Sequence, residues 1–234
     1  MLADASAIEV SKSAGRRGKI RALLASGLVL GVGAAFTLAA WTDDEWVFGG
    51  AGPGTDTPGT KIYAMQQNTL APFAEASWVD RPTPNGGRLD FTVNATDLLP
   101  GDTVYAPFQL RAVAGSEALT VSLAEARQAT NPAAGPTNST ALYNALRYQA
   151  WIGLDAADCS AAGDKSGGTA LVAANSRLDT LGSVSFPLAA GASGAAGEPE
   201  NLCFAMTLPA GTTDTSLQGK NVVPLWRFTS VTGQ

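Results

Sequence analysis

Histidine, the side chain that most often acts as a catalytic acid or base, is missing from this chain. The sequence has no histidine, which excludes Ser-His-Asp and Cys-His nucleophilic catalysis and histidine-ligated zinc. It also lacks the HExxH, GxSxG and P-loop patterns of zinc hydrolases, serine hydrolases and nucleotide-binding proteins. Carboxylates, lysines and backbone groups remain as possible catalysts.

Paired acids are the main candidates for hydrolysis, because two carboxylates at a suitable separation suffice for a glycosidase. The candidate groups are Asp43 with Asp44 and Glu45, Asp97 with Asp102, and Glu198 with Glu200, and a loop cation site could form at Asp155 and Asp158. All of them lie in turn-like or terminal sequence, where solvated carboxylates are usual. We therefore assign no catalytic, cofactor-binding or metal-binding residue and expect a protein that is not an enzyme.

Two cysteines, Cys159 and Cys203, are the only ones in the chain. An even number of cysteines in an exported protein predicts one disulfide, and two buried free thiols are the alternative. A bridge that closes a loop of about 45 residues would be worth about 4 kcal/mol in the chain-entropy model.

Tryptophan is the other residue type that could form a site, because its ring stacks on sugars and docks on other subunits. Trp78, Trp151 and Trp226 lie in alternating segments, where a core position is usual. Trp41 and Trp46 differ, since they lie on an N-terminal tail that also carries Phe48. Apolar side chains on a tail need a surface to dock on.

Period-two alternation of apolar residues places most of the chain on β-strands. In the clearest unit, residues 88–94 set Leu89, Phe91 and Val93 on one face, residues 99–102 make a turn, and residues 104–110 return. Pro107 lacks a backbone donor, which favours an edge or a bulge in the return strand.

Similar alternation recurs in residues 117–123, 147–154, 184–188, 202–208 and 221–231, with one possible helical turn at residues 141–145. Many short strands with turn residues between them, and almost no helical periodicity, indicate an all-β protein. We expect a jelly-roll-like β-sandwich.

The N-terminal residues have the order of a secretory signal peptide. Cations at Arg16, Arg17, Lys19 and Arg21 precede an uncharged run at residues 22–40, and three acids follow. Basic, apolar and acidic parts in this order match an export signal in the positive-inside orientation. Small residues before the junction predict cleavage between Ala39 and Ala40.

An uncleaved helical anchor is the alternative, because the run is long enough to cross a bilayer of about 30 Å. The pair at residues 16–17 also leaves a twin-arginine route open.

The expected organisation is a cytosolic lead and helical signal peptide at residues 1–39, a tail and linker at 40–60, and a β-sandwich at 61–234. Removing residues 1–39 takes away five of the 15 cations and two of the 20 acids, which leaves a formal net charge of −8. Nucleic-acid binding needs clustered cations, so we expect none. The acidic balance suits a secreted protein.

The leader and the tail together resemble those of TasA and camelysin-type proteins, whose leaders are cut by the SipW signal peptidase. Thr37-Leu38-Ala39 corresponds to the small-x-Ala cleavage site, Ala40-Trp41-Thr42-Asp43 to the Ala-aromatic-x-Asp start, and Phe48-Gly49 to the aromatic-Gly pair. The turn at residues 97–103, with residues 108–110 after it, is similar to the family's L-x-PGD reversal.

The resemblance implies a secreted jelly-roll subunit of extracellular biofilm fibres. Residues 40–48 would add a strand to the next subunit, with Trp41, Trp46 and Phe48 as anchors, and main-chain hydrogen bonds would supply the affinity. The implied partners are copies of the chain or a related matrix protein, and a signal peptidase during export; contact with the membrane would be through the uncleaved signal alone. The alternative is a secreted carbohydrate- or cell-wall-binding β-sandwich that uses exposed tryptophans.

Overall fold

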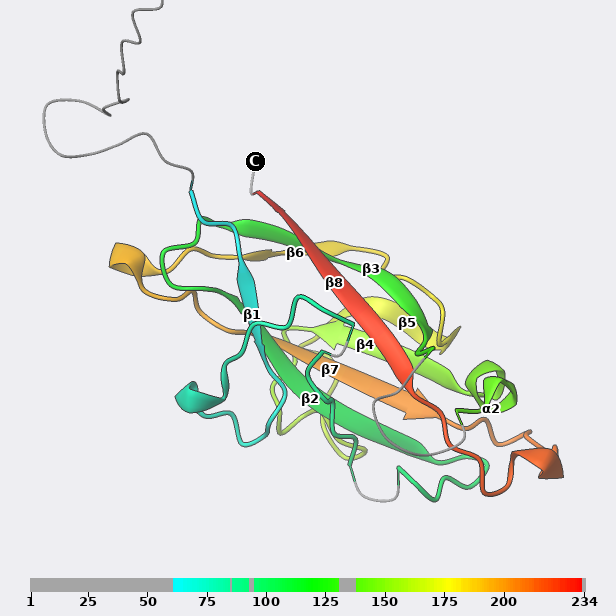
Figure 1. Ribbon diagram of the computed structural model, residues 1–234. Helices are drawn as coiled ribbons and strands as arrows, with labels where there is room; N and C mark the ends of the chain where they lie inside the picture. The colour runs from blue at the N-terminus through cyan, green and yellow to red at the C-terminus, as the bar shows by residue number, and fades with distance from the viewer. Residues whose placement is uncertain (1–60, 85, 93–94, 131–137, 233–234) are drawn as a thin grey trace, which may run out of the picture. The chain divides into compact units, whose positions relative to one another are not determined.

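The computed structural model describes residues 61–234 apart from 85, 93–94, 131–137 and 233–234, and this part of the chain is built mostly of antiparallel β-strands (Figure 1). The strands are β1 (Met65–Asn68), β2 (Thr103–Ala112), β3 (Leu119–Gln128), β4 (Arg147–Ile152), β5 (Thr169–Arg177), β6 (Ser185–Leu188), β7 (Glu200–Thr207) and β8 (Pro224–Thr232). The helical elements are α2 (Thr140–Ala145) and three 3-10 turns at Glu75–Ser77, Ala192–Gly194 and Thr215–Leu217. The predicted all-β class is confirmed.

The strands form two sheets. Five strands lie in the order β1-β2-β7-β4-β5, and three lie in the order β6-β3-β8. Every strand pair within the two sheets is antiparallel.

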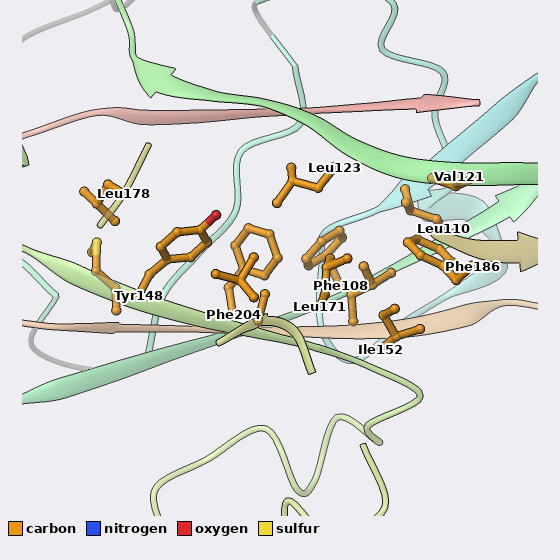
Figure 2. Close-up of a cluster of buried hydrophobic side chains, with 14 of the residues drawn as sticks. Phe108, Leu110, Val121, Leu123, Tyr148, Ile152, Leu171, Leu178, Phe186 and Phe204 are labelled. Atoms are coloured by element: carbon orange, nitrogen blue, oxygen red, sulfur yellow. The ribbon is translucent and has the colours of Figure 1, made fainter. Parts of the chain in front are cut away.

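The core consists of side chains that alternate inward from both sheets (Figure 2). Phe204 lies at its centre, with its ring centroid 4.9 Å from that of Trp226 and 5.1 Å from that of Phe108, both edge to face. Burying a large apolar side chain contributes about 1.5–3 kcal/mol. This aromatic cluster therefore joins β2 and β7 of one sheet to β8 of the other.

The alternation correctly predicted the return strand β2 and the strands β3, β4, β6, β7 and β8. The predicted helical turn is also confirmed. It begins after Ser139, whose hydroxyl accepts a hydrogen bond from the Leu142 amide at 3.2 Å and so caps the first turn of α2.

The prediction of a strand at residues 88–94 was wrong for the described residues of that segment. Leu89 and Phe91 do pack against the core, with the Phe91 ring 6.3 Å from that of Trp226. Among the described residues 88–92, the backbone is held to β2 near Thr92, whose amide donates to the Tyr105 carbonyl at 2.8 Å and whose hydroxyl accepts from the Tyr105 amide at 3.1 Å. Side chains of this segment cover the core without a backbone ladder, which gives the same period-two pattern as a strand.

Pro107 lies where the outer side of β2 is not paired with β1. β1 pairs with β2 only from Gln109 to Ala112. Because the Tyr105 amide and carbonyl both face Thr92, alternation turns the Pro107 nitrogen toward the same outer side. The missing donor therefore costs no hydrogen bond to β7. Of the predicted edge or bulge, the structure shows an outer side of β2 unpaired with β1 at Pro107 and no register shift against β7.

β5 was not predicted, because its burial pattern does not alternate. Only Leu171 and Val172, at 0% and 1% exposed, are buried along the strand. The pairing of β4 with β5 also shifts twice, between Tyr148 and Ala150 and between Ala150 and Trp151. Extra residues in β5 at these bulges break the period of two.

Candidate functional site

Five of the residues expected to act in processing or assembly lie outside the described residues: Ala39, Ala40, Trp41, Trp46 and Phe48. The uncharged run at 22–40 lies outside them as well. In the described part of the chain no helix is both long and apolar enough to cross a membrane.

Cys159 and Cys203 form the predicted disulfide, with their Cα atoms 5.5 Å apart. Both cysteines are buried, and they pack with Trp151, Leu154 and Ala205 on the outer side of the five-stranded sheet. The bridge fastens the loop at residues 155–168 to β7.

The three tryptophans predicted to be in the core have different environments. Trp151 is 8% exposed, and Trp226 is half-buried against Phe204 and Tyr148. Trp78 is half-buried outside the core, beneath the Arg111 guanidinium, whose central carbon lies 4.1 Å from its ring centroid. Its predicted core position was therefore wrong, because a cation stacks on the ring instead of apolar neighbours.

Arg111 holds the segment around Trp78 on the outside of β2. Its guanidinium donates two hydrogen bonds to the Glu75 carboxylate, at 2.9 and 2.6 Å, although Arg111 itself is only 8% exposed. The paired cation lowers the pKa of Glu75 below its ordinary value. The ion pair and the stacked ring together account for the attachment of residues 75–78.

The first candidate site is the outer edge of β8. Within the described residues β8 pairs with β3 alone, over Pro224 to Thr232. The residue before β8, Val223, shows which backbone groups point toward β3. Its carbonyl accepts from the Ala129 amide at 2.9 Å and its amide donates to the Asn138 side chain at 3.0 Å, both on the β3 side. Alternation along this unbulged strand turns the backbone groups of Phe228 and Ser230 away from β3.

The other three edge strands are shorter or covered. β1 has four residues, and Gln67 exchanges two 2.9 Å hydrogen bonds with Val79 on its free side. β6 also has four residues. β5 is bulged, and its Leu171 carbonyl accepts from the Ser183 amide at 2.9 Å. Among described strands, β8 thus presents the longest regular edge to a further strand.

The second candidate site is a hollow of about 230 Å³ on the outer face of the five-stranded sheet. Its lining includes Thr103, Tyr105, Gln149, Trp151, Asn175 and Ala205. The strand register explains the depression: Ala205 of β7 lies between Tyr105 of β2 and Gln149 of β4. A methyl group between two long side chains leaves a gap above the sheet.

A bulge in β5 forms one wall of the hollow. Between the Tyr148–Ser176 and Ala150–Val172 pairs, β5 has more residues than β4, and Asn175 in this stretch has a φ of 59°. A left-handed conformation at a residue other than glycine is unfavourable, and asparagine tolerates it better than most. Bulges of this kind often re-aim side chains next to functional sites.

The cations near the hollow are already engaged by backbone carbonyls. Arg147 donates from one nitrogen to the carbonyls of residues 144, 145 and 146, at 2.8 to 3.1 Å. Lys165 donates to the carbonyls of Ser160 and Gly163 at 2.6 and 2.8 Å and lies 5.2 Å from the Tyr105 ring centroid. Among the described residues, the amides of Gln149 and Asn175 have no such partner.

The acids singled out in the sequence mostly serve turns and loops. Asp102 accepts from the Leu99 amide at 2.8 Å, Asp158 from the Asp164 amide at 3.2 Å, and Asp155 from the Asn201 side chain at 3.0 Å. Burial raises the pKa of Glu200 above its ordinary value, against a hydrogen bond from the Gly153 backbone. Within the described ranges, no group of three or more His, Cys, Asp or Glu residues converges as a metal site.

Sequence reasoning did not find the hollow, because it is made by three strands and a bulge whose register the sequence does not reveal. The one available signal was the outward position of Tyr105 on the predicted return strand. The fold and these sites define a β-sheet-rich, disulfide-containing protein in which β8 is the longest regular open edge among the described strands. No protein-family model matches the sequence, and no curated protein is significantly similar to it.

Proposed function

We propose that this chain is a secreted structural protein, a self-assembling subunit of extracellular or cell-surface fibres such as those of a biofilm matrix. Residues 40–48 of one copy would add as a donor strand to the outer edge of β8 in the next. The partner is a second copy of the chain or a related matrix protein. The leader directs export and is removed between Ala39 and Ala40.

The observation that carries this proposal is the open edge of β8, a strand of nine residues. The tail at residues 40–48 has the same length; as a strand it would turn Trp46 and Phe48 to one face and Trp41 to the other. The sheet that would receive it has three strands against five in the other. Val231, at 63% exposed, offers apolar surface near the end of this edge.

We also propose that the sandwich has a jelly-roll-like topology. This proposal is supported by the connections, because the chain passes from one sheet to the other between β2 and β3, β3 and β4, and at every connection from β5 to β8. Chains that alternate between two sheets in this way are typical of double-sheet jelly rolls.

Deletion of the tail tests the assembly proposal. Protein that begins at Ala40 is expected to form filaments in negative-stain micrographs, whereas protein that begins at residue 51 is expected to remain a folded monomer by sedimentation and circular dichroism. A variant that keeps the full tail but replaces Trp41, Trp46 and Phe48 by Ser separates tail length from the anchor side chains, and it should assemble poorly. Filaments of unchanged yield from the truncated protein would reject the donor-strand role.

The alternative function is a secreted carbohydrate- or cell-wall-binding module. This alternative was based on exposed tryptophans. It loses support because Trp151 is buried and Trp226 is half-buried against neighbouring side chains. The hollow beside Trp151 is the feature that favours sugar binding.

A further inference from the structure

We propose that the hollow on the outer face of the five-stranded sheet binds one pyranose ring of a neutral glycan. The site is independent of the β8 edge, since β8 belongs to the other sheet. Its volume of about 230 Å³ is below the roughly 300–1,000 Å³ of pockets that enclose drug-sized ligands. A single ring of a longer chain suits a shallow hollow of this size.

A small floor residue, an aromatic side chain and a β-bulge give the hollow its shape. Ala205, only 4% exposed, forms a small floor. Tyr105 contributes aromatic surface to the lining, whereas Trp151 is itself only 8% exposed. The bulged strand β5 carries Asn175 on the opposite side of the hollow, in a left-handed conformation that asparagine adopts more readily than most other residues.

The polar groups of the hollow favour a neutral ligand. The amides of Gln149 and Asn175 can each donate and accept, which is what vicinal sugar hydroxyls require. Thr103 and Thr207 add two hydroxyls, 2.7 Å apart. No carboxylate lines the hollow within the described residues, and its one lining cation, Arg147, is tied to backbone carbonyls.

The net negative charge of the protein disfavours an acidic polysaccharide as the ligand. Residues 40–234 have a formal net charge of −8, and like charge slows and weakens the approach of a polyanion. Neutral hexose chains avoid this repulsion. Apolar contact with the Tyr105 ring, together with hydrogen bonds from the Gln149 and Asn175 amides, would hold one apolar and one polar face of a sugar ring.

The test is calorimetric titration of the mature protein with cellohexaose and laminarihexaose as neutral probes and a galacturonic acid hexamer as the acidic one. Saturable binding of a neutral probe is expected, with weaker or no binding of the acidic hexamer. Gln149→Met removes an amide at similar volume, and Asn175→Gly removes the other while keeping the left-handed backbone. Each is expected to weaken binding about three- to tenfold.

Ala205→Leu fills the floor and should abolish binding, and Thr120→Val on the outer face of the three-stranded sheet should leave it unchanged. The proposal is overturned if neither neutral probe binds, if the acidic hexamer binds more tightly than both, or if Gln149→Met and Asn175→Gly bind as the unmodified protein does. Circular dichroism confirms that each variant is folded. Because binding is measured without reference to filaments, failure here and failure of assembly are separate results.

Discussion

Two buried tyrosines in neighbouring parts of the core differ in whether their hydroxyl groups are satisfied. The Tyr148 hydroxyl donates to the Thr180 carbonyl, whereas the Tyr143 hydroxyl has no hydrogen-bond partner among the described residues. A buried polar group without a partner costs free energy, and a satisfied one contributes about 0.5–1.5 kcal/mol. The two residues thus predict opposite effects of the same substitution.

Tyr148→Phe is expected to lower the free energy of unfolding by about 1 kcal/mol, and Tyr143→Phe to leave it unchanged or raise it. Urea denaturation of the two variants beside the parent protein measures both effects. A larger loss for Tyr143→Phe than for Tyr148→Phe would contradict the assigned hydrogen bonding.

Alkaline pH acts on Tyr143 as well. Burial raises the pKa of Tyr143 from 10.0 to about 12, so the folded state holds this proton more tightly than the unfolded state. The resulting stability is fully present below pH 10 and is lost as the pH rises toward 12. The denaturation midpoint should fall across this window, and it should fall less in the Tyr143→Phe variant.

At the scale of elements, the disulfide joins the loop at 155–168 to β7, across 44 residues of sequence. Its removal in the double variant Cys159→Ala, Cys203→Ala should reduce the free energy of unfolding by about 2–4 kcal/mol, because the unfolded chain regains the entropy of an open loop. Guanidinium denaturation measures the loss. Two alkylated thiols in denatured, unreduced parent protein would show that the bridge is absent.

The sequence predicted those elements whose burial alternates along a single strand. The alternation at Leu119, Val121 and Leu123 in β3 marks an inward face that survives whatever the neighbouring strands are. The same logic failed at residues 88–94, where Leu89 and Phe91 face the core from a segment without a ladder. Periodicity reports which side chains are buried and does not report backbone pairing.

The candidate sites depend on information that the sequence does not carry directly. The hollow arises because Ala205 falls between Tyr105 and Gln149, which depends on the register of three strands. The strand β5 was not predicted because its bulge at Asn175 interrupts the alternation, and the sequence does not reveal the bulge. Cysteine counting did predict the disulfide, since only one pairing of Cys159 and Cys203 is possible.

On the scale of the whole molecule, the described sandwich has one sheet face with a hollow and one long open edge in the other sheet. Open edges of this length are usually protected, because they pair with other chains. β8 carries Pro224 at its start and Arg227 on its exposed face, and from Phe228 to Thr232 it has no charged residue or proline. We interpret this half of the strand as the surface that receives the tail of the next subunit.

The most direct measurement of this claim is filament assembly by protein in which Ser230 is replaced by Pro, compared with the Ser230→Ala control. Alternation turns the Ser230 amide outward, so proline there removes a hydrogen bond to an incoming strand and spares the ladder with β3. Sedimentation and negative-stain microscopy of the mature proteins should show folded Ser230→Pro monomers and Ser230→Ala filaments. Filaments of equal yield from a folded Ser230→Pro protein would contradict assembly through the β8 edge.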